Sequence, residues 1–145
     1  VCPAVALKEA QGGWRSRSAA VAALRDRLRD QLLKLPGAVL NGSREQRLPN
    51  NVNISIPGLD TEYAVVVLDS HGIAASTKSA CSGAGGGLSA VVEAMTADPA
   101  RAAATLRFTL GPDVTPAALD RVVPLLKEHI QQMSEFNQSA QTHNT

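Results

Sequence analysis

The sequence predicts an α/β domain, a two-layer sandwich in which a small mixed, mostly antiparallel sheet carries helices on one face. Three observations support this fold class. Segments with apolar residues at helical spacing alternate along the chain with short segments of alternating polarity. The predicted strands keep one polar side, which indicates that helices of this chain cover only one face of the sheet. The 145 residues, 44% of them hydrophobic and only 3% aromatic, suffice for one domain with an aliphatic core.

Two helices are predicted at the start of the chain. The first covers residues 4–10 and is interrupted at Gly12. The second covers residues 14–35 and is amphipathic, because leucines and valines recur three or four residues apart on one stripe. Pro36 ends it. The residues of this stripe are Val21, Leu24, Leu28, Leu32 and Leu35.

Short strands and a helix follow. Residues 38–40 form a short strand, and residues 51–56 form a half-buried strand in which Val and Ile alternate with Asn and Ser. Asp60 is a suitable N-cap for a helix that extends to Ser70. Residues 73–76 then form another short strand.

A brief helix, a strand and a long helix complete the domain. The brief helix covers residues 91–95 and ends at Asp98. Residues 105–110 alternate in polarity, as expected of a half-buried strand. Thr115 caps the last helix, which begins with a proline. Pro124 lies inside this helix and is expected to kink it.

The composition argues against several classes of protein. The formal net charge is +1 and the basic residues are scattered, whereas a nucleic-acid-binding surface needs a basic stripe. Two cysteines are too few for a disulfide framework. No apolar run is long enough to span a membrane, and the first residues lack the pattern of a signal peptide. A reducing cytoplasm is therefore the expected location.

Cys81 is the strongest candidate for chemistry. It lies among small polar residues, and glycines follow it, in the segment 74–87, AASTKSACSGAGGG. Such a segment is typical of a mobile, solvent-reachable loop, whereas a structural cysteine usually lies in apolar surroundings. Lys78 and the start of a helix near Leu88 would both lower the pKa of the thiol by favouring the thiolate. The alternatives are a small core residue at Cys81, an ordinary exposed lysine at Lys78 and a plain glycine linker.

Arg107 is the second candidate. It lies in the middle of a predicted strand between apolar neighbours, where its guanidinium could hold a carboxylate through two hydrogen bonds. The alternative is a surface arginine on an exposed sheet face. His71 at a helix C-terminus suits the helix dipole, and neither His129 nor His143 belongs to a cluster with metal-ligand spacing. The glycines form no phosphate-binding motif.

Three motifs, taken together, resemble the C-terminal part of cysteine desulfurases, which are pyridoxal-phosphate enzymes of the class V aminotransferase group. The motifs are LPNNVNISIPG at 48–58, GIAASTKSACS at 72–82 and LRFTLG at 106–111. They occur in the order and at the spacing of that family, and the resemblance extends over residues 3–132.

The resemblance implies a domain organisation. It identifies the chain as the small domain of a fold-type I pyridoxal-phosphate enzyme. Residues 1–13 would end the segment that connects to a large domain, residues 14–133 would form the small C-terminal domain, and residues 134–145 would be a polar, frayed tail.

The resemblance also implies a chemistry. The family removes sulfur from L-cysteine and leaves alanine, with pyridoxal phosphate as the electron sink. By motif position, Cys81 is similar to the nucleophile that becomes a persulfide, and Arg107 is similar to the arginine that holds the substrate carboxylate. The sulfur then passes to sulfur-acceptor or scaffold proteins for iron–sulfur cluster and thio-cofactor synthesis. The full-length enzymes of the family are homodimers.

Several features depart from the family pattern. The cofactor lysine of the family usually follows a histidine in the large domain, and none of Lys8, Lys34, Lys78 and Lys127 does so. This chain alone is therefore expected to contain no cofactor-binding residue and to be inactive. Lys78 stands where the family usually has a small residue, and residues 86–88 replace a common Leu-Glu-Pro.

Two other functions remain open. The chain could be a non-catalytic persulfide carrier or protein-binding module that uses Cys81 as a relay. It could also belong to a related pyridoxal-phosphate-dependent lyase or aminotransferase in which Cys81 is incidental.

Overall fold

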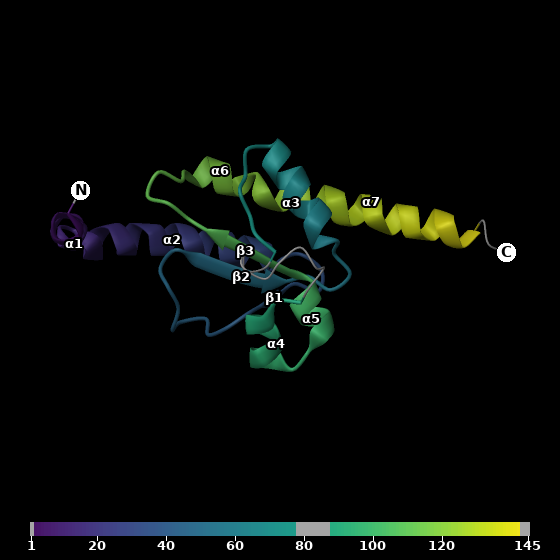
Figure 1. The fold of residues 1–145 in the computed structure, drawn as a ribbon. Helices are drawn as coiled ribbons and strands as arrows, with labels where there is room; N and C mark the ends of the chain where they lie inside the picture. Colours follow the sequence, from purple (N-terminus) through teal and green to yellow (C-terminus); the bar gives the residue numbers. More distant parts are fainter. Residues whose placement is uncertain (1, 78–87, 143–145) are drawn as a thin grey trace.

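The computed structural model describes residues 2–77 and 88–142, the side chains of residues 136–142 excepted. In this part of the chain, three short strands form one antiparallel sheet with the order β1-β2-β3, and helices lie on both sides of it (Figure 1). The strands are β1 (Val39–Leu40), β2 (Asn51–Ser55) and β3 (Thr105–Thr109). The helices are α1 (Pro3–Gln11), α2 (Trp14–Leu32), α3 (Thr61–Ser70), α4 (Ala90–Thr96), α5 (Pro99–Ala103), α6 (Pro116–Asp120) and α7 (Val122–Thr142).

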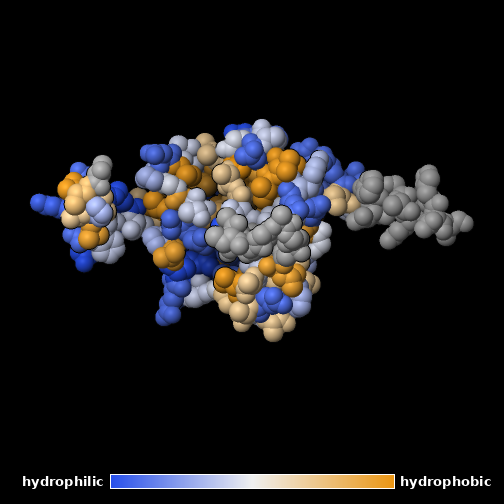
Figure 2. Space-filling model, in the orientation of Figure 1, coloured by the Kyte–Doolittle hydropathy of each residue, from blue (hydrophilic) through white to orange (hydrophobic). Residues whose placement is uncertain are grey.

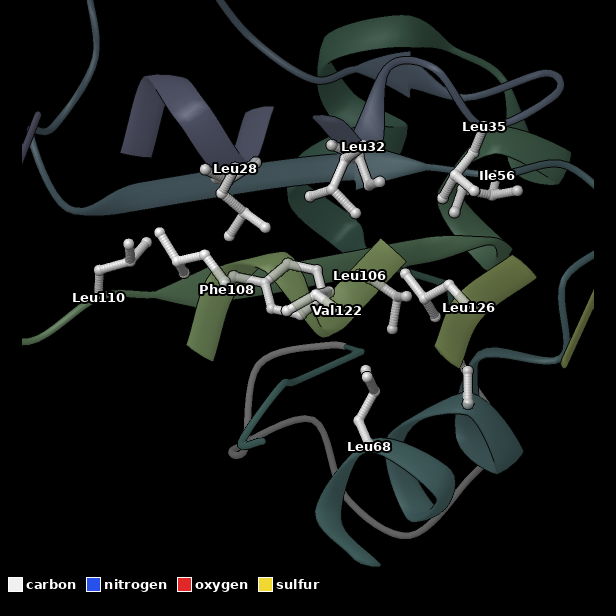
Figure 3. Close-up of a cluster of buried hydrophobic side chains, with 14 of the residues drawn as sticks. Leu28, Leu32, Leu35, Ile56, Leu68, Leu106, Phe108, Leu110, Val122 and Leu126 are labelled. Carbon is white, nitrogen blue, oxygen red and sulfur yellow. The ribbon is translucent and has the colours of Figure 1, made fainter. Parts of the chain in front are cut away.

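Helices cover one face of the sheet and form the core with it. Val52 and Ile54 of β2 and Leu106 and Phe108 of β3 point to this face and are nearly inaccessible to solvent. They pack against apolar side chains of α2, α3, α6 and α7 (Figure 3). Those helix residues are Leu28, Leu32, Ala64, Leu68, Leu119, Val122 and Leu126. The α/β class, with helices layered on a mostly antiparallel sheet, is confirmed.

The opposite face of the sheet is polar, because alternate residues of a strand point to opposite faces. At one end of this face Ser55 and Thr105 are 0% and 1% exposed, since α4 and α5 lie beside them. Figure 1 shows α4 and α5 on the other side of the sheet from α3, α6 and α7. Elsewhere on this face, among the described residues, Asn51, Asn53 and Arg107 are half-buried and Thr109 is exposed. The facing pairs on it are Asn51 and Thr109, Asn53 and Arg107, and Ser55 and Thr105.

The segment 73–76, expected as a strand, contributes a single bridge between Ser76 and Arg107. The reason lies at its start. The Ile73 N–H donates to the carbonyl of Leu68 at 2.9 Å, which ties this end of the segment to the last turn of α3. Ser76 is therefore the residue of the segment that pairs with β3.

The C-terminal helices also differ from the sequence expectation. Instead of one kinked helix, the chain breaks at Arg121 into α6 and α7, so that Pro124 lies in the first turn of α7. A first-turn proline removes no helical hydrogen bond. Asp98, expected to end a helix, instead caps α5 by accepting from the Arg101 N–H at 3.0 Å. The tail remains helical as far as Thr142.

Candidate functional site

Arg107 lies in the middle of β3 on the polar face of the sheet. Its partner on β2 is Asn53. On the other side, the Arg107 N–H donates to the carbonyl of Ser76 at 2.7 Å, and the Ser76 N–H donates to the carbonyl of Arg107 at 3.0 Å. These two backbone hydrogen bonds to Ser76, together with the pairing of β3 with β2, fix the position from which this half-buried side chain extends.

A hollow of about 230 Å³ opens beside Arg107. Arg107 is the one charged residue in its described lining, and within the described residues its guanidinium has no hydrogen bond or ion pair. A guanidinium with unused donors matches the two oxygens of a carboxylate. The hollow therefore suits a small carboxylate anion. Its lining consists of Leu48, Asn51, Asn53, Thr77, Ser89, Val91 and Arg107.

Apolar side chains border the hollow on its outer side. Leu48 and Val91 line it and are 68% and 60% exposed, and Met95 on the next turn of α4 is 52% exposed. Figure 2 shows hydrophobic residues gathered over α4, in the lower part of the view. In its described lining, the hollow thus combines the Arg107 guanidinium with polar walls and an exposed apolar rim.

Cys81 and Lys78, together with the glycines at 83 and 85–87, lie outside the described residues. The described residues on either side of this segment are informative. Thr77, just before it, and Ser89, just after it, both line the hollow beside Arg107. Ser89 is held there because its N–H donates to the carbonyl of Ala102 at 3.1 Å. Both anchors of the segment that carries Cys81 therefore stand at this hollow.

A network of polar side chains lies behind the hollow. The Asn41 side chain, in a residue that is 4% exposed, donates through Nδ2 to Asn53 Oδ1 at 2.7 Å and to Ser55 Oγ at 2.8 Å. Asn41 Oδ1 accepts from Arg101 Nε at 2.7 Å. Ser55 Oγ lies 3.0 Å from Thr105 Oγ1, which donates to the Arg101 carbonyl.

The sequence motifs do not indicate this network. The alternation of polar residues along β2 was the available signal, and it indicates only that they share a face. Asn41 follows the predicted strand 38–40, and Arg101 lies on α5, a helix that the sequence pattern does not predict. The local sequence around Asn41 and Arg101 does not show that their side chains form a hydrogen bond.

Arg47 borders the network without lining the hollow. Its Nη2 donates to the Asn41 carbonyl at 2.7 Å, and its buried Nη1 has no partner among the described residues. Burial lowers the pKa of the Arg47 guanidinium, and the positive charges of Arg25 and Arg29 act in the same direction. Arg47 therefore supports the chain after β1 and has no contact with the candidate site.

The described histidines lie away from the hollow. His71 Nδ1 is 2.9 Å from the Val67 carbonyl at the end of α3, and His129 is 2% exposed with its ring 5.0 Å from that of Tyr63. His143 falls outside the described residues. Among residues 2–77 and 88–142, no group of three or more His, Cys, Asp or Glu could hold a metal ion. No helix in the same residues is long and apolar enough to cross a membrane.

Comparison with known proteins gives a consistent family assignment. The family model described as aminotransferase class-V matches residues 4–122. The chain is 38% identical over 124 residues to "Cysteine desulfurase IscS 1" of Archaeoglobus fulgidus, an alignment that covers 86% of this chain and 32% of the relative. It is 38% identical over 114 residues to "Cysteine desulfurase IscS" of Methanosarcina thermophila, covering 79% and 28%. The chain therefore spans about a third of the length of these relatives.

Solved structures show the same fold. A NifS-like protein from Rickettsia africae has a TM-score of 0.65 and 22% identity, over 79% of this chain and 29% of the other. A second NifS-like protein has a TM-score of 0.72 and 23% identity, over 88% and 32%.

Proposed function

Because this chain belongs to the class V aminotransferase family, we propose that it is the small domain of a cysteine desulfurase. In this proposal residues 14–133 form the small domain, residues 1–13 end the connection to a large domain, and residues 134–145 are a tail. The domain moves sulfur from L-cysteine to Cys81 as a persulfide and leaves alanine. The two relatives from Archaeoglobus fulgidus and Methanosarcina thermophila, both named cysteine desulfurase, support this assignment.

The observation that carries the proposal is the position of the Arg107 hollow between the two anchors of the Cys81 segment, Thr77 and Ser89. Arg107 binds the α-carboxylate of the substrate through its unused donors. Cys81 lies four residues after Thr77, so its Cα can be at most about 14 Å from that of Thr77. A thiol on that tether can approach a substrate held by Arg107 and can also turn outward to an acceptor.

The reaction needs no external oxidant or reductant. The Cys81 thiolate attacks the sulfur of L-cysteine, and a sulfur–sulfur bond forms. The bond between that sulfur and Cβ breaks with its electron pair left on the carbon side, and a proton completes alanine. The thiolate is the required form, because a thiol is a poor nucleophile. In the proposal Lys78 favours it electrostatically, although Lys78 also departs from the family pattern.

The described residues do not supply a site for the cofactor that the family implies. Pyridoxal phosphate is held by a lysine and serves as an electron sink when bound. None of the described lysines, Lys8, Lys34 and Lys127, lines the hollow, and no aromatic residue there could stack on a pyridine ring. We therefore assign cofactor binding to the part of the relatives' length that this chain does not span. The chain alone is expected to bind no cofactor and to be inactive.

The proposal extends to partners and location. The complete enzyme would be a homodimer in the cytoplasm that passes the sulfur of Cys81 to acceptor or scaffold proteins for iron–sulfur cluster and thio-cofactor synthesis. The exposed apolar rim at Leu48 and Val91 is compatible with a protein surface that covers the hollow.

The test is a pair of cysteine substitutions in the protein that contains this chain at the full length of its relatives. Cys81→Ser should abolish alanine formation from L-cysteine and the persulfide that mass spectrometry detects on the Cys81 peptide. Cys2→Ser is the matched control, since Cys2 is the exposed N-cap residue of α1 and does not line the hollow. Unchanged turnover in Cys81→Ser would instead support a related lyase or aminotransferase.

A second test uses this chain alone. With L-cysteine and added pyridoxal phosphate it should release no sulfide, and sulfide release would contradict the fragment assignment. A persulfide on Cys81 that is accepted from a donor enzyme and passed on, with no cysteine turnover at full length, would favour the carrier function.

A further inference from the structure

We infer that Asn53 is a second hydrogen-bond donor to the substrate carboxylate, beside Arg107, and that Asn41 and Arg101 fix the orientation of its amide. The inference rests on the proposed function, because it concerns the same α-amino acid site. It adds a binding residue and two positioning residues that the sequence motifs do not single out.

Asn53 and Arg107 lie side by side on the polar face of the sheet. They are directly paired in the register of β2 and β3, and both side chains line the hollow. Directly paired residues on one face of an antiparallel sheet have Cβ atoms about 5 Å apart. Both side chains can therefore reach the two oxygens of one carboxylate.

The orientation of the Asn53 amide follows from the donors and acceptors behind it. An arginine N–H can only donate, so the Asn41 atom that faces Arg101 Nε at 2.7 Å must be the oxygen. The other branch of Asn41 is then the NH₂ group, whose two hydrogens are directed to Asn53 and Ser55. The Asn53 atom that meets Asn41 must therefore be its oxygen.

The remaining members of the network agree with this direction. Thr105 uses its hydroxyl hydrogen on the Arg101 carbonyl, so Ser55 donates to Thr105 and is free to accept from Asn41. Each hydrogen in the network has one acceptor, and reversing the Asn41 amide would set two N–H groups against each other. A buried network with one consistent direction strongly favours a single orientation of each amide.

The consequence for the hollow is specific. With its oxygen bound by Asn41, Asn53 has only its NH₂ group left, and within the described residues this group has no partner. No acidic residue appears in the described lining of the hollow. A guanidinium and a neighbouring amide NH₂ together form a donor pair for a carboxylate.

The test replaces the donor while keeping the shape and the network. Asn53→Asp retains an oxygen for Asn41 Nδ2 but presents a negative oxygen to the hollow. In the full-length protein with Cys81→Ser, which blocks turnover, calorimetry should show about 10- to 100-fold weaker binding of L-cysteine. Binding of cysteamine, which lacks the carboxylate, should not weaken. If Asn53→Asp weakens the binding of L-cysteine and cysteamine equally, or weakens the binding of neither, the inference is wrong.

Asn51→Asp controls for charge, because it adds the same charge to the same hollow without touching the network. Its effect on L-cysteine binding should be clearly smaller than that of Asn53→Asp. An equal effect would show that the added negative charge, and not the loss of the Asn53 amide donor, weakens binding. If Asn53→Asp does not fold, Asn53→Ser removes the amide without adding charge and gives the same comparison between the two ligands.

The positioning residues have their own readout. Arg101→Leu removes the donor that orients Asn41, so the Asn53 amide is no longer restricted to one orientation. This variant should also weaken L-cysteine binding relative to cysteamine, by less than Asn53→Asp. An unchanged ratio of the two affinities would overturn the positioning role.

Failure of this inference is distinguishable from failure of the proposed function. If the wild-type protein converts L-cysteine to alanine and Asn53→Asp binds L-cysteine as the wild type does, only the role of Asn53 is wrong. If the wild-type protein binds another α-amino acid and leaves L-cysteine unchanged, the desulfurase proposal is wrong and the Asn53 comparison is made with that amino acid and its decarboxylated analogue.

Discussion

Ser76 and Arg107 are joined by a reciprocal pair of backbone hydrogen bonds, at 2.7 Å and 3.0 Å. This pair links the strand that carries the candidate carboxylate-binding arginine to the residues that immediately precede the Cys81 segment. A change in the position of one is therefore transmitted to the other. Thr77, the next residue, already lines the hollow beside Arg107.

Breaking this pair should loosen the site. Ser76→Pro removes the N–H that donates to the Arg107 carbonyl, and we expect the free energy of unfolding to fall by about 1–3 kcal/mol. Amide hydrogen exchange at Arg107 should accelerate. Ser76→Ala keeps both backbone bonds and should change stability by less than about 0.5 kcal/mol. Equal free energies of unfolding of the two variants in urea would show that the bridge between Ser76 and Arg107 does not stabilise the fold.

The buried hydroxyl pair of Ser55 and Thr105 gives a second prediction. Thr105→Val leaves the Ser55 hydroxyl without its acceptor, and Ser55→Ala leaves an Asn41 N–H without one. Each change should lower the free energy of unfolding by about 1–3 kcal/mol. The double variant should lose less than the sum of the two, because the partners share one network. Strict additivity in a double-mutant cycle would contradict the contact.

Ala97 offers a stabilising substitution. It ends α4 in the left-handed region, with φ 50° and ψ 30°, where a Cβ is unfavourable and glycine is preferred. Ala97→Gly should raise the free energy of unfolding by roughly 0.5–1 kcal/mol. Ala94→Gly, on the exposed side of the same helix, should lower it by about 1 kcal/mol. Chemical denaturation of both variants checks the opposite signs.

The pair of Arg27 and Asp120, which joins α2 to α6, predicts a pH dependence. The Arg27 guanidinium binds Asp120 at 2.8 Å, and this hydrogen bond, followed by that of Gln31, lowers the pKa of the Asp120 carboxyl. A carboxyl whose pKa is lower in the folded state stabilises the fold above its unfolded pKa of about 3.9 and loses this contribution as pH falls through the folded value.

The measurement compares melting temperatures of wild type and Asp120→Asn across pH. The wild type should be the more stable from neutral pH down to about pH 4, and the difference should close below that. Asp113→Asn is the control, because Asp113 is exposed and has no ion pair within the described residues. A difference that is constant from pH 7 to strongly acid pH would contradict the ion pair.

Local patterns predicted most of the regular structure. The stripe on α2 and the alternation in β2 and β3 report which residues are buried, and burial follows a period that is visible in a short window. Asp60 was recognised as a cap and accepts from the Tyr63 N–H at 3.0 Å. The split at Arg121 and the extra helix α5 were missed, because a proline can either end a helix or begin one and neighbouring packing decides between them.

The candidate site was predictable only in part. Its motifs placed Arg107 on a strand, and the polar face of that strand follows from its alternation. The roles of Cys81 and Arg107 and the domain boundaries remain predictions. Cys81→Ser tests the role of Cys81, and the assay of sulfide release by the chain alone tests the fragment assignment.

The amino-acid order alone determined the α/β class, the aliphatic core and the motifs that mark the family. The fold decided which distant residues meet. Arg101 and Asn41 are 60 residues apart and become hydrogen-bond partners only when α5 packs beside the polar face. The hydrogen bond from Arg101 orients the Asn41 amide, and Asn41 in turn binds the Asn53 oxygen, which leaves the Asn53 NH₂ group for the hollow. Periodicity reports the face on which a side chain lies, whereas hydrogen-bond direction depends on partners that long-range packing supplies.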